Sequence, residues 1–103
     1  MLSEDRINEL INLGFKRWTK GNYDRLYINA FKLGLECTYY GTGNISSAEF
    51  CGEHISNSEA RRLRDAKTYI DVKTELVHSN KSSLAWAAAE LAKVNVCEKK
   101  EWP

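Results

Sequence analysis

The first third of the chain carries two runs of apolar residues at helical spacing. In the first run, Ser3 is a suitable N-cap, and the acidic residues Glu4 and Asp5 suit the positive end of a helix dipole. The apolar positions that follow are Ile7, Leu10, Ile11, Phe15 and Trp18. Their spacing predicts an amphipathic helix that either ends at Gly14 or continues, weakened by this glycine, to Trp18.

The second run follows a break at residues 20–22. It consists of Tyr23, Leu26, Tyr27, Ala30 and Phe31. This spacing predicts a second helix that is capped by Asn22 and closed by Gly34, which can adopt the left-handed conformation. Because the link between the two helices is short, we expect them to form an antiparallel pair.

From residue 35 the pattern changes to alternation. Residues 35–40 and 45–51 are predicted strands, and the Gly- and Asn-rich residues 41–44 are typical of the turn between them. Ser56 and Glu59 have the spacing of a capping box, in which each side chain accepts a backbone N–H of the first helical turn. A short, basic helix is therefore predicted over residues 57–66.

The last third repeats the same kinds of element. Residues 68–72 and 76–78 are predicted strands of a second hairpin, and the Ala-rich residues 84–94 a helix capped by Asn80 or Ser82. The complete order is α-α-β-β-α-β-β-α. Because each pair of strands is local in sequence, we expect antiparallel hairpins packed by helices, without a parallel crossover. The predicted fold is a single α+β domain over residues 1–103, frayed at residues 1–2 and 95–103.

The composition narrows the class of protein. The chain has 103 residues, of which 43% are hydrophobic, and a net charge of +1. These values are typical of one folded domain with its own core rather than a disordered chain. We see no apolar run of the roughly 18 residues that a membrane span needs, and no signal-peptide pattern. The odd number of cysteines (Cys37, Cys51 and Cys97) favours reduced thiols, and we expect the protein in the cytoplasm.

The near-zero net charge conceals charged blocks. Residues 1–34 carry six basic and four acidic side chains, whereas residues 35–60 carry four Glu and no Lys or Arg. Residues 61–67 are again basic, and residues 68–103 are balanced. Such segregation is informative about partners rather than about the fold.

Three segments of the sequence resemble a known group of proteins. They are residues 15–29 (FKRWTKGNYDRLYIN), residues 40–46 (YGTGNIS) with 55–61 (ISNSEAR), and residues 67–74 (KTYIDVKT). In this order they resemble small uncharacterised proteins carried by phages and mobile elements of Firmicutes, over about residues 15–90. After Lys73 and Thr74, where the resemblance leads us to expect a glycine, this sequence has Glu75. The resemblance implies a genomic setting in which small proteins often inhibit host defence complexes, as anti-CRISPR proteins do.

Two groups of cations are candidates for binding a partner. In the first group, basic residues interleave with the aromatic residues Trp18 and Tyr23, so cations could neutralise phosphates while rings stack on bases. The alternative is that the rings belong to the helical core and the cations to its solvated edge. The second group lies on the predicted short helix, where arginines suit bidentate contacts. The candidate cations are Lys16, Arg17, Lys20, Arg25, Arg61, Arg62 and Arg64.

Other constellations carry weaker signals. Cys51 and His54 have the spacing of a metal-ligand pair, but structural zinc needs four ligands, usually as two close pairs. Buried thiols and an exposed histidine are the alternative, and we expect neither a metal nor another cofactor. The acidic block (Glu36, Glu49, Glu53 and Glu59) could imitate nucleic-acid phosphates or simply protect strand edges. The chain contains no nucleophile elbow, phosphate loop or paired-carboxylate motif, so no catalytic residues are assigned.

These observations favour a non-enzymatic binding protein that occupies a surface of a host protein or ribonucleoprotein complex, as an anti-defence inhibitor. One alternative is a nucleic-acid-binding accessory factor that uses the basic helices with Trp18 or Tyr23. A zinc- or thiol-dependent enzyme built on Cys51 and His54 is the third hypothesis. The oligomeric state stays open.

Overall fold

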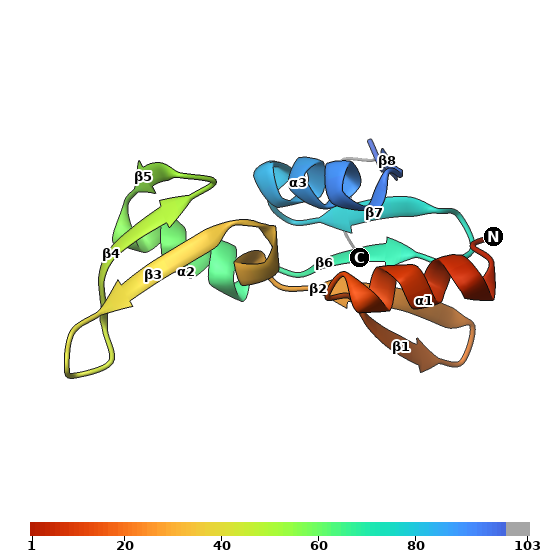
Figure 1. Cartoon of the computed structure of the whole chain (residues 1–103), viewed down its shortest axis with the longest axis horizontal. Helices are drawn as coiled ribbons and strands as arrows, with labels where there is room; N and C mark the ends of the chain where they lie inside the picture. The colour runs from red at the N-terminus through yellow and green to blue at the C-terminus, as the bar shows by residue number, and fades with distance from the viewer. Residues whose placement is uncertain (99–103) are drawn as a thin grey trace.

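The computed structural model describes residues 1–98, in which helices and strands alternate (Figure 1). The elements are α1 (Glu4–Asn12), β1 (Lys16–Lys20), β2 (Tyr23–Ile28), the 3₁₀ helix η1 (Ala30–Leu33), β3 (Leu35–Tyr39), β4 (Ile45–Phe50), β5 (Glu53–Ile55), α2 (Asn57–Asp65), β6 (Thr68–Asp71), β7 (Leu76–Ser79), α3 (Ser82–Ala92) and β8 (Asn95–Val96). The predicted α+β class is confirmed. The predicted elements occur in the predicted order as α1, η1, β3, β4, α2, β6, β7 and α3, and the structure adds β1, β2, β5 and β8.

The helix prediction was wrong between residues 15 and 28. Helix α1 ends at Asn12, and a hairpin of β1 and β2 replaces the extension to Trp18 and most of the second helix. Tyr23 and Tyr27 are four residues apart, a spacing that places two side chains on one face of a helix and equally on one face of a strand. The β-branched and aromatic residues of these segments favour the strand, and Gly21, with φ 58°, supplies the turn.

The larger sheet, which we call sheet A, has the strand order β1-β2-β6-β7-β8. Its first four strands are antiparallel, as predicted for hairpins, whereas β8 pairs with β7 in parallel. Helix α3 connects β7 to β8, so this part of the chain is a β-α-β crossover that the hairpin pattern did not predict.

Helices cover one face of sheet A. Helices α1 and α3 lie on the same side of the sheet, and their ends nearest η1 flank that 3₁₀ helix (Figure 1). The core between them consists of buried apolar side chains from both layers, including Ile7, Leu10, Leu26, Ile70, Val77, Leu84 and Ala88. The strand residues that alternate with these core residues therefore point to the face opposite the helices.

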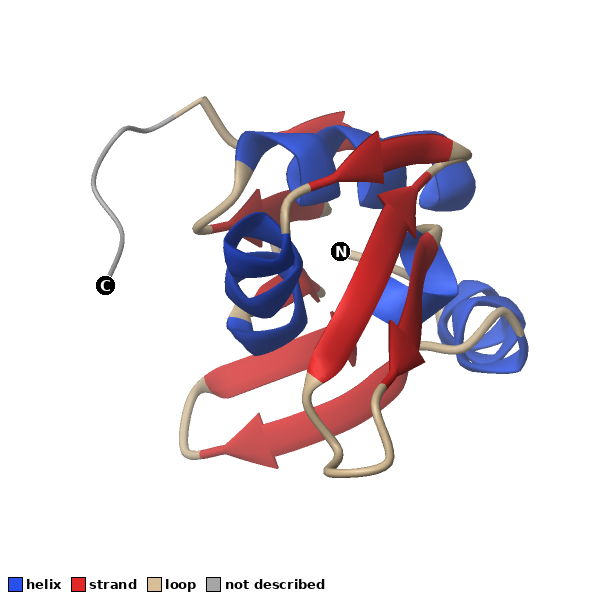
Figure 2. Ribbon diagram, turned by 90° about the vertical axis from the view of Figure 1, so that its left-hand side faces the viewer, coloured by secondary structure: helices blue, strands red, loops and turns tan. Residues whose placement is uncertain are grey.

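The smaller sheet, sheet B, has the order β3-β4-β5 and is antiparallel throughout. Helix α2 packs on one face of it through the buried residues Ala60 and Leu63, as Figure 2 shows from this end of the molecule. The N-cap bond of the predicted capping box is present at the start of α2, where Ser56 Oγ accepts the N–H of Glu59 at 3.1 Å. The Glu59 carboxylate contacts Arg62 at 3.7 Å and Lys81 at 3.8 Å. The predicted strand over 45–51 ends at Phe50, and a turn at Cys51 and Gly52 leads into β5.

The short helix η1 joins the two sheets. Its buried residues Ala30 and Leu33 lie in the common core, and η1 contacts α3, α2 and β3. Gly34 follows in the left-handed conformation predicted for it, with φ 120°. A single apolar core therefore continues from sheet A to sheet B. In the described part of the chain, no helix is both long and apolar enough to cross a membrane.

Leu2 and residues 95–97, which we expected to fray, belong to the fold. Leu2 is buried, and its N–H donates to the carbonyl oxygen of Val72 at 2.9 Å. Asn95 and Val96 form β8, and Cys97 is buried and donates its N–H to Val77. Residues 99–103, including Trp102, lie outside the described residues.

Candidate binding surface

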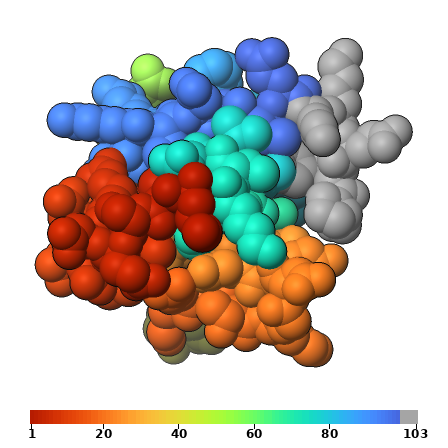
Figure 3. All heavy atoms as spheres, turned by 90° about the vertical axis from the view of Figure 1, so that its right-hand side faces the viewer, coloured from red at the N-terminus to blue at the C-terminus, as the bar shows by residue number. Residues whose placement is uncertain are grey.

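The strand register of sheet A brings aromatic and basic side chains to its open face. Residues that pair directly across antiparallel strands share a face, and so do residues two apart along one strand. Lys16, Tyr27, Tyr69 and His78 form one such row, Trp18 and Arg25 the next, and Lys20 and Tyr23 a third. We call these eight residues the aromatic–cationic face. The hairpin that carries six of them lies beside α1 at the end of the molecule that Figure 3 shows (orange).

The rings of this face form a continuous ladder across four strands. Trp18 lies 6.5 Å from Tyr23, nearly parallel to it, and 6.2 Å from Tyr27 in an edge-on arrangement, measured between ring centroids. Tyr69 continues the ladder, 5.2 Å from Tyr27 and 5.0 Å from the ring of His78, on which it stacks. Aromatic contacts at these separations stabilise the side-chain positions, so the rings are held in place before any partner arrives.

Arg25 is held inside this ladder. Its guanidinium carbon lies 4.5 Å from the ring centroid of Tyr23 and 4.3 Å from that of Tyr69. Its Nη1 donates to the hydroxyl oxygen of Tyr27 at 3.1 Å, and this hydrogen bond raises the pKa of Arg25. Burial raises the pKa of Tyr69, so its hydroxyl stays neutral beside the cation. The buried Nε of Arg25 has no acceptor among the described residues, which leaves one cationic donor unsatisfied.

The outer part of the face is open to a partner. Trp18 and Tyr23 are 41% and 55% exposed, and with Lys20 they line a hollow of about 560 Å³ at the hairpin turn. A second hollow of about 270 Å³ has Lys16 and Tyr27 on one side and Lys67, just after α2, on the other. Lys16, Lys20 and Lys67 form no ion pair with another described residue. Their charges are therefore available to an external group.

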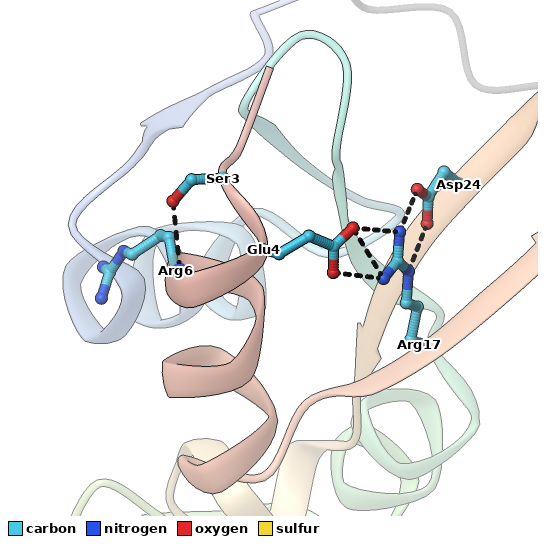
Figure 4. A network of polar contacts seen from close by, with 5 residues as sticks. All are labelled: Ser3, Glu4, Arg6, Arg17 and Asp24. Carbon is cyan, nitrogen blue, oxygen red and sulfur yellow. Dashed lines mark hydrogen bonds and ion pairs between the residues drawn. The ribbon is translucent and has the colours of Figure 1, made fainter.

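Arg17, predicted with this group, lies on the opposite, helix-covered face. Its guanidinium contacts Asp24 at 2.7 Å and Glu4 at 3.0 Å, so that it connects β1 to β2 and to α1 (Figure 4). The hydrogen bonds to Asp24 and Glu4 raise the pKa of Arg17, and the same contact with Arg17 lowers the pKa of Asp24. The role that this geometry supports for Arg17 is to hold the hairpin against α1.

The arginines of the second predicted group lie on α2, which packs on sheet B. Arg62 is 3.7 Å from Glu59, and Arg64 is 3.1 Å from Asp65. Arg61 is exposed and has no ion pair with another described residue. The structure therefore brings together Lys16, Lys20 and Arg25 with Trp18 and Tyr23, but it does not place the α2 arginines on the same sheet face.

Sequence reasoning did not assign Tyr69 and His78 to a site. The signal was present in the predicted hairpin, because Tyr69 and His78 occupy outward positions of strands whose Ile70 and Val77 point to the core. Only the pairing of β2 with β6 joins them to Arg25 and Tyr27. These pairs are more than 40 residues apart in the sequence, and no local pattern specifies which strands become neighbours.

Residues 1–98 add no further metal ligand to the pair of Cys51 and His54. Cys51 lies in the turn before β5 and its thiol contacts the carbonyl oxygen of Leu33 at 3.5 Å. The described residues contain no group of three or more His, Cys, Asp or Glu side chains placed to hold a metal ion. The three cysteines are free thiols, with Cys97 buried and Cys37 half-buried.

The acidic block is divided by the fold. Glu36 and Glu49 are paired directly across β3 and β4, and His54 lies opposite Glu49, on the face of sheet B away from α2. Glu53 pairs with Phe50 on the other face, and Glu59 contacts Arg62 and Lys81. The block therefore does not form one continuous acidic surface.

Comparison with protein-family models, curated proteins and solved structures found no match for this chain. A proposal of function consequently depends on the residues of the surface itself.

Proposed function

We propose that this chain is a non-enzymatic binding protein that occupies a surface of a host protein or ribonucleoprotein complex with its aromatic–cationic face. The observation that carries the proposal is the clustering of exposed Trp18 and Tyr23 with Lys16 and Lys20 on one sheet face, where neither lysine has an ion pair among the described residues. Trp, Tyr and Arg are the side chains that contribute most to binding energy in macromolecular interfaces. Rings and cations of this kind suit recognition rather than covalent chemistry.

The preorganisation of the face supports the same proposal. Arg25 is fixed between two rings, and the rings contact one another across four strands. Because these side chains are ordered before binding, little conformational entropy is lost when a partner contacts them. A rigid, partly apolar surface with free positive charge is suited to tight contact with a complementary, negatively charged partner.

The biological setting of the proposal comes from the sequence resemblance. A small protein of phage or mobile-element origin, acting in the bacterial cytoplasm, would counter host defence by blocking such a complex, in the manner of anti-CRISPR inhibitors. The shape fits a blocking role, because the molecule is elongated and the hairpin that carries most of the face forms the β1 edge of sheet A (Figure 1).

Co-purification from host cells tests the proposal. Tagged wild type, Trp18→Ala and Trp86→Ala would be expressed in parallel, and bound proteins and nucleic acids quantified by mass spectrometry and sequencing. Trp86 is the matched control because it is a 63% exposed tryptophan on α3, on the other side of sheet A. We expect one partner complex to be retained by wild type and Trp86→Ala and lost with Trp18→Ala. The same set of partners with all three chains would contradict the proposal.

A further inference from the structure

We infer that the aromatic–cationic face binds single-stranded nucleic acid, with bases stacked on Trp18 and Tyr23 and phosphates contacted by Lys16 and Lys20. This inference rests on the proposed function, because it names the chemical class of ligand that the same face contacts. It is carried by the arrangement of rings and charges on the β1–β2 hairpin.

The outward side of β1 alternates cation, ring and cation. Lys16, Trp18 and Lys20 occupy every second position of an extended strand, so neighbours on this face are about 7 Å apart. This distance is comparable to the separation of consecutive phosphates in an extended single strand. A ring flanked by two cations at this interval matches one base with the phosphates on either side of it.

The second exposed ring extends the platform. Tyr23 lies beside Trp18 at 6.5 Å with an angle of 26° between the ring planes, so the two rings present nearly parallel surfaces. Every base has a π-face, and stacking on such rings needs no particular sequence. Bases in a duplex are stacked on one another and have no face free for Trp18 or Tyr23, so the arrangement favours a single strand.

The charge of the face also favours a polyanion. Arg25 lies over the rings of Tyr23 and Tyr69 and forms no ion pair with another described residue. Asp71 pairs with Arg25 in the strand register, and its Oδ1 accepts the backbone N–H groups of Lys73 and Thr74 at 2.9 and 3.0 Å. Lys16, Lys20 and Arg25 outnumber this carboxylate, so the described residues of the face carry net positive charge beside the rings, which suits the negative phosphate backbone.

A path for the strand continues beyond the hairpin. The hollow of about 270 Å³ next to Lys16 and Tyr27 is bounded on its other side by Lys67. A strand that stacks on Tyr23 and Trp18 and passes Lys16 reaches this hollow and a further free cation. The expected footprint thus runs from the β1–β2 turn across the sheet edge to the residues that follow α2.

The test uses fluorescently labelled 12-mers of deoxythymidine and of uridine, and a 12-base-pair DNA duplex, with affinities measured by anisotropy at two salt concentrations. We expect both single strands to bind at least about 10-fold more tightly than the duplex. Trp18→Ala should weaken binding about 10-fold, corresponding to one lost stacking contact. Lys20→Gln should weaken it and reduce the slope of log K against log salt by about 0.7, the value for one phosphate contact on a single strand.

Matched control variants distinguish binding at the aromatic–cationic face from nonspecific attraction to the whole protein surface. Trp86→Ala and Lys73→Gln remove an exposed tryptophan and an exposed lysine outside the face and should leave the affinity unchanged. Trp18→Phe keeps a ring and should retain most of the binding. Circular dichroism of each variant confirms that it is folded, and Tyr23→Ala serves as a second probe of stacking if Trp18→Ala unfolds.

The outcomes distinguish this inference from the proposed function. The inference is overturned if neither 12-mer binds at low salt, or if binding is insensitive to Trp18→Ala, Tyr23→Ala and Lys20→Gln. If the oligonucleotides fail to bind while a nuclease-treated host partner is still lost with Trp18→Ala, the ligand is a protein surface and only the inference falls. If the binding of every partner is independent of the face, both the inference and the proposed function are contradicted.

Discussion

Sheet A and sheet B are each covered by helix on one face and open on the other, yet their open faces differ in chemistry. Sheet A presents rings in mutual contact, together with Lys16 and Lys20, which form no ion pair within residues 1–98. Sheet B presents the carboxylates Glu36 and Glu49 directly opposite one another, with hydroxyl groups in the next row, where Thr38 Oγ1 and Ser47 Oγ are 2.5 Å apart. The same architecture therefore carries a preorganised binding surface in one half and a self-repelling polar surface in the other.

The comparison shows that the side chains, rather than the backbone, determine whether an open sheet face can serve as a binding surface. Like charges that are directly opposite destabilise a strand pair, so the row of Glu36 and Glu49 reduces the stability of sheet B. The rings of sheet A have the opposite effect, because cross-strand aromatic contacts stabilise the sheet and simultaneously form a contact surface. Five experiments can break or sharpen this comparison, and they are described from the largest expected effect to the smallest.

The two halves should unfold together. Leu26 on β2 and Leu35 on β3 are fully or almost fully buried in the apolar core that η1 continues between the sheets. Leu26→Ala and Leu35→Ala should each lower the free energy of unfolding by about 3 kcal/mol, as is usual for such cavities. Urea unfolding followed by far-ultraviolet circular dichroism and by tryptophan fluorescence should give one coincident transition in both variants. A separate early transition in Leu35→Ala would show that sheet B is an independent unit.

Reversing charge should affect ligand binding only on sheet A. Lys16→Glu combined with Lys20→Glu replaces two free cations beside Trp18 with anions, and we expect oligonucleotide affinity to fall about 100-fold or more. The paired control, Glu36→Lys combined with Glu49→Lys, changes the net charge by the same amount in the opposite direction and should leave affinity within a few-fold of wild type. A gain in affinity from this control as large as the loss from the first double variant would mean that net charge, and not the face, determines binding.

Removal of Arg17 should separate stability from binding. Arg17→Ala breaks the contacts to Asp24 and Glu4, and we expect the free energy of unfolding to fall by about 1 kcal/mol, within the range for a partly exposed ion-pair network. Oligonucleotide affinity should be unchanged, because Arg17 lies on the helix-covered face. A large loss of affinity in a folded Arg17→Ala chain would contradict this assignment.

The same variant predicts a pH dependence. Arg17 lowers the pKa of Asp24 in the folded state, so this carboxyl group stabilises the fold above its unfolded pKa of about 3.9 and loses that contribution as the pH falls through the folded value. The difference in stability between wild type and Arg17→Ala should therefore be largest near neutral pH and shrink below about pH 4. Urea midpoints measured between pH 2.5 and pH 7 test this sign. A constant difference would show that Asp24 is not the titrating partner.

The smallest effect is expected from relieving the repulsion on sheet B. Glu36→Gln removes one of two opposed charges and should raise the free energy of unfolding by about 0.5 kcal/mol, less at high salt. Glu53→Gln is the control, because Glu53 pairs with Phe50 on the other face. Equal stabilisation by both substitutions would indicate a general charge effect instead of the Glu36–Glu49 pair.

Local signals predicted part of this structure well. The Ser56 N-cap of α2, the left-handed Gly34 and the β3–β4 and β6–β7 hairpins depend on contacts within a few residues, and each is present. The stretch from residue 15 to residue 28 was predicted wrongly because a spacing of four residues satisfies both helical and strand periodicity. The parallel strand β8 was missed because its partner lies across α3, and two residues carry too little pattern to predict a strand.

The candidate surface shows the same division. The basic and aromatic residues of the hairpin were identified from their interleaving, but they were assigned to helices, and Arg17 was grouped with them. Whether a residue of β1 points to the open face or to α1 depends on alternation along a strand, so the wrong element type gave the wrong partners. Tyr69 and His78 joined the surface only through the pairing of β6 with β2 and β7.

The sequence by itself determined the α+β class, the order of the local elements, the N-caps Ser3 and Ser56, and the interleaving of rings with cations. These features depend on propensities and contacts between near neighbours in the chain, so they can be recognised without a partner element. Tertiary structure alone decided the strand order, the separation of Arg17 from Lys16 and Lys20, and the position of Arg25 between Tyr23 and Tyr69. Those features arise when distant segments bury a common core, because the free energy of that burial selects which strands pair and therefore which side chains share a face.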